Sequence, residues 1–126
     1  MIDKIFSSPS YDGSKVMMDV AITRQEIFSS NLGNIETPGF KRLELSKDFT
    51  KVFAEAMKAG KPGSVQKPSV ATDLFSPSQR KDGNNVILQD ELLAMNKNGA
   101  EYETMVDFIN GSMRTLRMAI QGRSQA

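Results

Sequence analysis

Two pairs of carboxylates are the side chains in this sequence whose types and spacing come nearest to catalytic chemistry. They are Asp90 with Glu91 and Glu101 with Glu103. Paired carboxylates act as general acid and base when an apolar setting shifts their pKa values. Here both pairs fall in a stretch with helical periodicity, where we interpret them as solvated faces and as charges at the start of a helix. We expect neither pair to be catalytic.

The composition excludes most other chemistry. The 126 residues contain no His, which removes the commonest general base and metal ligand, and no Cys, which removes disulfides and thiolate metal sites. The sequence also has no glycine-rich phosphate loop. We therefore predict that the protein is not an enzyme and holds no cofactor and no metal.

Charge and hydropathy limit the possible partners. The net charge is +1 and no basic stripe carries aromatic residues, so neither nucleic acid nor an acidic membrane surface should attract the chain. No apolar run approaches the roughly 20 residues that span a bilayer, so we expect no membrane insertion. The first seven residues lack the apolar core of a secretory signal. If the protein leaves the cytoplasm, we expect a route without signal cleavage.

The strongest structural signal lies in residues 87–121. Apolar residues recur there at alternating steps of four and three, the heptad spacing of one long helix that lies against another. The predicted helix seam consists of Leu88, Leu92, Met95, Gly99, Tyr102, Val106, Ile109, Met113, Leu116 and Ile120. Gly99 on this seam either permits a close approach between helices or is merely tolerated, because Gly costs roughly 1 kcal/mol inside a helix.

A second heptad-like helix is predicted for residues 14–33, with Ser14 as its N-cap and Gly33 as its end. Its seam consists of Met18, Ala21, Phe28 and Leu32, and Gln25 interrupts it. Residues 1–13 are predicted to form an N-terminal arm, which is either mobile or folded into one helical turn. Two such helices near opposite ends of the chain predict an antiparallel, coiled-coil-like hairpin. Further apolar residues are expected to face neighbouring molecules, namely Met17, Val20, Ile27, Met105 and Phe108.

The middle of the chain is predicted to be mostly irregular. Pro38-Gly39 indicates a type II turn within a turn region at 34–45. A short amphipathic helix is predicted over 46–59, between an N-cap at Ser46 and a stop at Gly60. Residues 60–86 form an extended Pro/Gly-rich loop, mobile alone and ordered against a partner. The predicted fold class is therefore mainly α, in a single domain over 1–126.

The turn region and its flanks resemble the signature of bacterial flagellar rod and hook proteins. That signature has two asparagines near the end of the first helix, then Thr-Pro-Gly and an aromatic residue. The matching residues here are Asn31, Asn34, Thr37, Pro38, Gly39 and Phe40. Asp-Gly-Asn-Asn-Val at 82–86 resembles the family element before the C-terminal helix. The chain is too short for the β domains inserted in distal members, so the resemblance favours the proximal rod.

The resemblance implies a structural subunit that polymerises through its terminal helices into a hollow drive shaft for motility. It implies a location in the periplasmic rod of the basal body, with other copies, the rod proteins FlgC and FlgF and the adaptor FliE as partners. It also implies recognition by the flagellar type III export gate, with Phe49 and Phe53 as the candidate contact. A two-helix core barely offsets chain entropy, which likewise favours burial against other molecules. The alternatives are a soluble helical adaptor, a secreted effector, or a sister rod protein such as FlgC.

Overall fold

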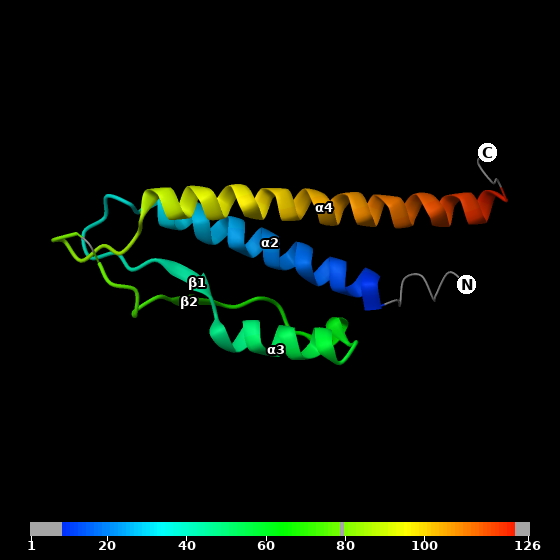
Figure 1. The fold of residues 1–126 in the computed structure, drawn as a ribbon, viewed down its shortest axis with the longest axis horizontal. Helices are drawn as coiled ribbons and strands as arrows, with labels where there is room; N and C mark the ends of the chain where they lie inside the picture. Colours follow the sequence, from blue (N-terminus) through cyan, green and yellow to red (C-terminus); the bar gives the residue numbers. More distant parts are fainter. Residues whose placement is uncertain (1–8, 79, 123–126) are drawn as a thin grey trace.

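A computed structural model describes residues 9–78 and 80–122 of the chain. The elements follow in the order α2 (Pro9–Gly33), β1 (Leu43–Leu45), α3 (Lys47–Lys58), the 3-10 helix η1 (Pro62–Ser64), β2 (Val70–Thr72) and α4 (Leu88–Gln121). The fold is mainly helical, as the sequence predicts. Figure 1 shows α2 and α4 running in opposite directions, in contact where α2 ends and α4 begins, and diverging toward the other end.

The N-terminal helix begins earlier than the sequence predicts. α2 starts at Pro9, so residues 9–13 of the expected arm are helical, and residues 1–8 lie outside the described part of the chain. Proline is compatible with the first helical position, because its missing N–H has no intrahelical partner there. Ser14 lies inside the helix and is buried, so it is not the N-cap. Gly13 faces Met57 and Pro62, and this tertiary packing holds the extra turn.

Near the start of α4, the contact with α2 does not follow the predicted seam. Leu92, Tyr102 and Met113 are 43%, 36% and 42% exposed. The buried positions near the start of α4 are instead Glu91 and Asn98, one residue earlier in the same seven-residue repeat. Both side chains hydrogen-bond to α2, and an unpaired buried polar group is costly. These bonds therefore set the rotation of α4.

The α2 side of this contact is apolar. Val20, Ala21, Ile27 and Phe28 are all buried. The prediction that Val20 and Ile27 face neighbouring molecules is therefore wrong, because both pack inside the chain. Gln25, which interrupts the predicted seam of α2, accepts a hydrogen bond from Asn98 at 3.4 Å.

The middle of the chain holds more regular structure than the sequence suggests. β1 and β2 pair antiparallel, with Leu43 opposite Thr72 and Leu45 opposite Val70. β2 and η1 both lie in the segment expected to be a loop without structure of its own. Strands of three residues are too short for a periodic signal.

The turn and the middle helix match their local sequence signals. Gly39 has a φ of +72°, and the Phe40 amide donates to the Thr37 carbonyl oxygen at 3.3 Å, which closes the turn centred on Pro38-Gly39. α3 begins one residue after Ser46, whose hydroxyl accepts a hydrogen bond from the Phe49 amide at 3.4 Å.

Candidate assembly site

A buried polar cluster fastens the end of α2 to the start of α4, and we call it the polar clasp. Its members are Asn31, Arg42, Asp73, Asn84, Asn85 and Glu91. Asn31, on the last turns of α2, is fully buried. Its amide nitrogen donates to the Leu43 carbonyl oxygen at 3.0 Å and to Glu91 at 3.2 Å, and its oxygen accepts from the Leu43 amide at 2.7 Å. One side chain thus ties α2, β1 and α4 together.

Asn84 joins the segment before α4 to the Thr-Pro-Gly turn. Its amide nitrogen lies 3.0, 3.1 and 2.9 Å from the carbonyl oxygens of Asn34, Ile35 and Thr37. Its oxygen accepts from the Val86 amide at 2.8 Å, and the side chain is 1% exposed. The two halves of the flagellar-like pattern, far apart in the sequence, are therefore in direct contact.

Arg42 links both sides of the clasp by charge. Its Nε donates to Glu91 at 2.8 Å, one of its terminal nitrogens donates to Asp73 at 3.0 Å, and its backbone amide donates to Asn85 at 2.6 Å. Burial alone would lower the pKa of the Arg42 guanidinium, but the hydrogen bonds and charges of Glu91 and Asp73 outweigh burial and raise it. Arg42 therefore stays charged.

Asp73 is held ionised in the same cluster. Burial favours the neutral acid, but hydrogen bonds from the hydroxyl and amide of Ser76, from Arg42 and from the Phe75 amide outweigh it. They hold the pKa of Asp73 well below its usual range. Asp73, Arg42 and Glu91 form an ion-pair network that runs from the residue after β2 to α4.

The structure places the motif residues in one continuous corner of the fold. Asn34 donates to the Ser30 carbonyl oxygen at 2.8 Å and accepts from the Thr37 hydroxyl at 3.2 Å. Pro38, Gly39 and Phe40 complete the turn to which Asn84 donates a hydrogen bond. The sequence reasoning missed three clasp members, Arg42, Asp73 and Glu91. Glu91 was expected to be solvated and is 2% exposed, so that interpretation is wrong.

A distinct surface lies along α4, where much of the predicted seam is exposed. We call it the free stripe, and it consists of Leu88, Leu92, Gly99, Tyr102, Met113 and Ile120. The remaining seam positions of α4, Met95, Val106 and Ile109, are half-buried, and Leu116 is buried. On α2, Ala21 and Phe28 are buried, and Met18 and Leu32 are half-buried. The chain thus leaves five large side chains of the seam exposed, with more buried positions between them.

The two candidate export residues pack against each other in α3. The ring centroids of Phe49 and Phe53 are 6.0 Å apart and the rings are nearly parallel, at 6°. Phe49 is buried and Phe53 is half-buried. In the folded chain, another protein could therefore not contact both rings together.

Over residues 9–78 and 80–122, no group of acidic side chains is placed to hold a metal ion. In the same part of the chain, no helix combines the length and apolar character needed to cross a bilayer.

Comparison with known proteins gives the family. No protein-family model matches the sequence. A flagellar basal body rod protein FlgB from Aeromonas hydrophila is 30% identical over 132 residues, covering 95% of each chain. The proteins of the same name from Aquifex aeolicus and Borreliella burgdorferi are each 30% identical, covering 81% and 78% of this chain and 85% of the relative. On this identity and coverage, the chain belongs to the family of flagellar basal body rod proteins FlgB.

Proposed function

We propose that the chain is a structural subunit of the flagellar basal-body rod, which polymerises through α2 and α4 into a hollow drive shaft. The observation that carries the proposal is the free stripe. Its exposed large side chains include Leu88, Leu92 and Ile120, which are 50%, 43% and 65% exposed along one long helix. Large apolar side chains left exposed along one helix favour contact with other molecules, since their burial is favourable by roughly 25 cal/mol per Å².

The fold supports an interlocking subunit rather than a self-sufficient domain. α2 and α4 contact each other mainly near the polar clasp and diverge beyond it (Figure 1). We infer that neighbouring helices pack beside α2 and α4 and complete a coiled-coil-like packing of the antiparallel pair. A contact between different surfaces of identical chains repeats without closing, so it generates a helical tube. The clasp fixes the angle at which both helices enter the tube.

The proposed location is the proximal rod in the periplasm, and the proposed neighbours are further copies, FlgC, FlgF and FliE. The family membership and the uncovered stripe support this placement. A monomeric adaptor would bury such a stripe within its own chain.

A deletion strain with matched rescue variants tests the proposal. We expect loss of motility and of rods in isolated basal bodies, with both restored by the wild-type gene. A variant with Leu92→Lys and Met113→Lys should not restore rods, because two charges would be buried between subunits. The control is Asn96→Lys, an exposed polar position of α4. A deletion strain with normal rods and motility would refute the function.

We also propose that the flagellar type III export gate recognises Phe49 and Phe53 in the unfolded chain. Because Phe49 is buried in the folded chain, this recognition would occur before folding rather than after it. Phe49→Ala with Phe53→Ala should block secretion without lowering the cellular level of the protein. Ile27→Ala, which also empties a buried apolar position, controls for lost stability and should still be secreted. Normal secretion of the double variant would remove this assignment.

A further inference from the structure

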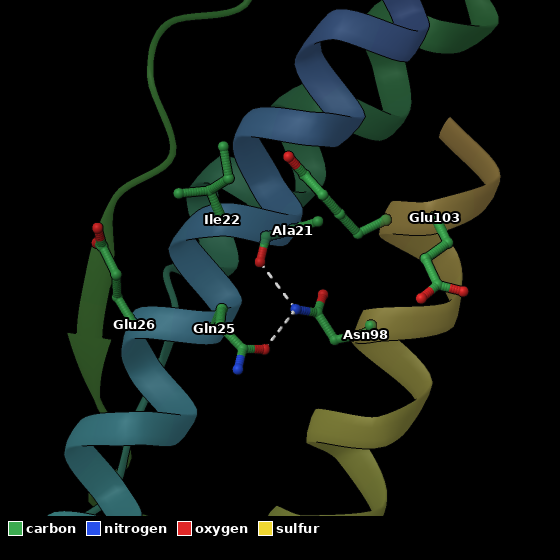
Figure 2. A pocket seen from close by; sticks show the side chains of 8 residues that line it. Ala21, Ile22, Gln25, Glu26, Asn98 and Glu103 are labelled. Atoms are coloured by element: carbon green, nitrogen blue, oxygen red, sulfur yellow. Dashed lines mark hydrogen bonds between the residues drawn. The ribbon is translucent and has the colours of Figure 1, made fainter. Parts of the chain in front are cut away.

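A groove between α2 and α4 lies apart from the polar clasp, about one third of the way along α4. Its volume is about 390 Å³, and Ala21, Asn98, Gly99 and Tyr102 are among its lining residues. Figure 2 shows Asn98 between the two helices, with Glu26 on one side of the groove and Glu103 on the other. The groove is mostly apolar, and both of its flanking charges are acidic.

Asn98 carries an acceptor that the chain leaves unused. The residue is 4% exposed, and its amide nitrogen donates to the Ala21 carbonyl oxygen at 2.8 Å. Its Oδ1 is buried and has no hydrogen-bond partner among the described residues. Native structures pair almost all buried polar atoms, so an orphaned one indicates a missing group. The missing group must be a donor.

The chemistry of the groove selects a cationic donor with several N–H groups. The unpaired amide oxygen of Asn98 and the carboxylate of Glu103 are acceptors, and a guanidinium offers five donors and no acceptor. Tyr102 lines the same groove and is 36% exposed, so its ring can turn aside to admit such a group.

The chain itself carries suitable donors at the other end of α4. Arg114 and Arg117 are exposed, and neither forms a salt bridge within the part of the chain that the structure describes. They lie 16 and 19 residues beyond Asn98 on one helix, which at 1.5 Å per residue is roughly 25 Å. They therefore cannot reach the groove of their own chain.

We propose that this groove binds Arg114 or Arg117 of a second copy, displaced by roughly 25 Å along the helix axis. The guanidinium would donate to Asn98 and pair with Glu103. The acidic first half of α4 would then meet the basic second half of its neighbour, in a contact that repeats from copy to copy. This inference rests on the proposed rod function and names one contact within it.

Gly99 gives the groove its depth. An added Cβ at Gly99 would meet nothing within 4 Å, so larger residues fit the free chain. Gly99→Leu would instead fill the space that an incoming arginine needs. We expect Gly99→Leu to fold and be exported yet to give no rods, whereas Gly99→Ala gives normal rods.

Disulfide cross-linking in isolated rods tests the contact directly, because the chain has no cysteine of its own. A variant with Glu103→Cys and Arg117→Cys should give a ladder of linked chains on mild oxidation. The control pairs Lys97→Cys with Arg117→Cys, since Lys97 lines a different pocket of the helix pair. A ladder from the groove pair alone supports the contact. Rods that contain the chain but give no ladder, or equal ladders from both pairs, overturn it.

A charge exchange covers the case in which the cysteine variant does not assemble. Glu103→Arg should reduce motility at least tenfold in swimming assays, and adding Arg117→Glu should restore most of it. A double variant no better than the single variants overturns the contact. Rods that lack the chain altogether would refute the proposed function instead, so the two failures are distinguishable.

Discussion

Glu91→Gln removes one charge from the centre of the polar clasp and keeps the shape of the side chain. Glu91 is 2% exposed and accepts from Arg42 at 2.8 Å and from Asn31 at 3.2 Å. The glutamine would turn an amide toward one of these two donors and leave that donor unpaired. Hydrogen bonds to charged groups contribute about 1.5–3 kcal/mol. Because a quarter of the Arg42 side chain is exposed and water can partly replace Glu91, we expect a loss of about 2 kcal/mol.

Urea unfolding of the purified chain, followed by far-UV circular dichroism, measures this loss. With a denaturant slope of about 1–2 kcal/mol per molar, the midpoint should fall by about 1–2 M. Asp90→Asn is the matched control, because Asp90 is the adjacent exposed carboxylate and should change stability by only about 0.5 kcal/mol. Arg42→Gln alone and combined with Glu91→Gln completes a double-mutant cycle. Equal midpoints for Glu91→Gln and Asp90→Asn would refute the reasoning that the clasp holds the helices together.

Three further predictions concern single side chains. The pKa of Asp73 is depressed in the folded chain, so the stabilisation by its ionised form is complete above the unfolded pKa near 4 and is lost as the pH falls below that value. The difference in free energy of unfolding between wild type and Asp73→Asn should therefore shrink in acid. A difference that does not change with pH would contradict this prediction. Gly39→Ala should lower the free energy of unfolding by about 1–2 kcal/mol, because the φ of Gly39 is +72°. Gly99→Ala should raise it by up to about 1 kcal/mol, because Gly99 lies inside a helix with open space around it. Melting temperatures that shift in the same direction for both variants would contradict these predictions. Asn84→Ala should cost about 2 kcal/mol and speed amide exchange in the Thr37–Phe40 turn, which unchanged exchange would disprove.

The sequence predicted those features that depend on local signals. Ser46 and Gly60 bound the middle helix, and Pro38-Gly39 makes the turn, because caps and turns are set by a few neighbouring residues. The long C-terminal helix followed from its heptad spacing. The helical start at Pro9 did not follow, because contacts of Gly13 with α3 and η1 hold it.

The rotation of α4 was not predictable from apolar spacing. Two stripes one residue apart repeat with the same seven-residue period, and hydropathy alone favours the apolar one. Near the start of α4 the structure buries Glu91 and Asn98 of the polar stripe, since both find partners on α2. Those partners lie 60 and 77 residues away in the chain, so no local pattern reveals them. The resemblance names Asn31 and Asn34, whose side chains form hydrogen bonds at the end of α2, but it does not name Arg42 or Asp73.

The most direct test of the central proposal is an electron cryo-microscopy map of rods in isolated basal bodies, fitted with this fold. We predict that α2 and α4 run lengthwise along the tube and that Leu92, Tyr102 and Met113 are buried between copies. A map in which this chain is present but its free stripe faces solvent, or in which the rod contains none of it, would contradict the account.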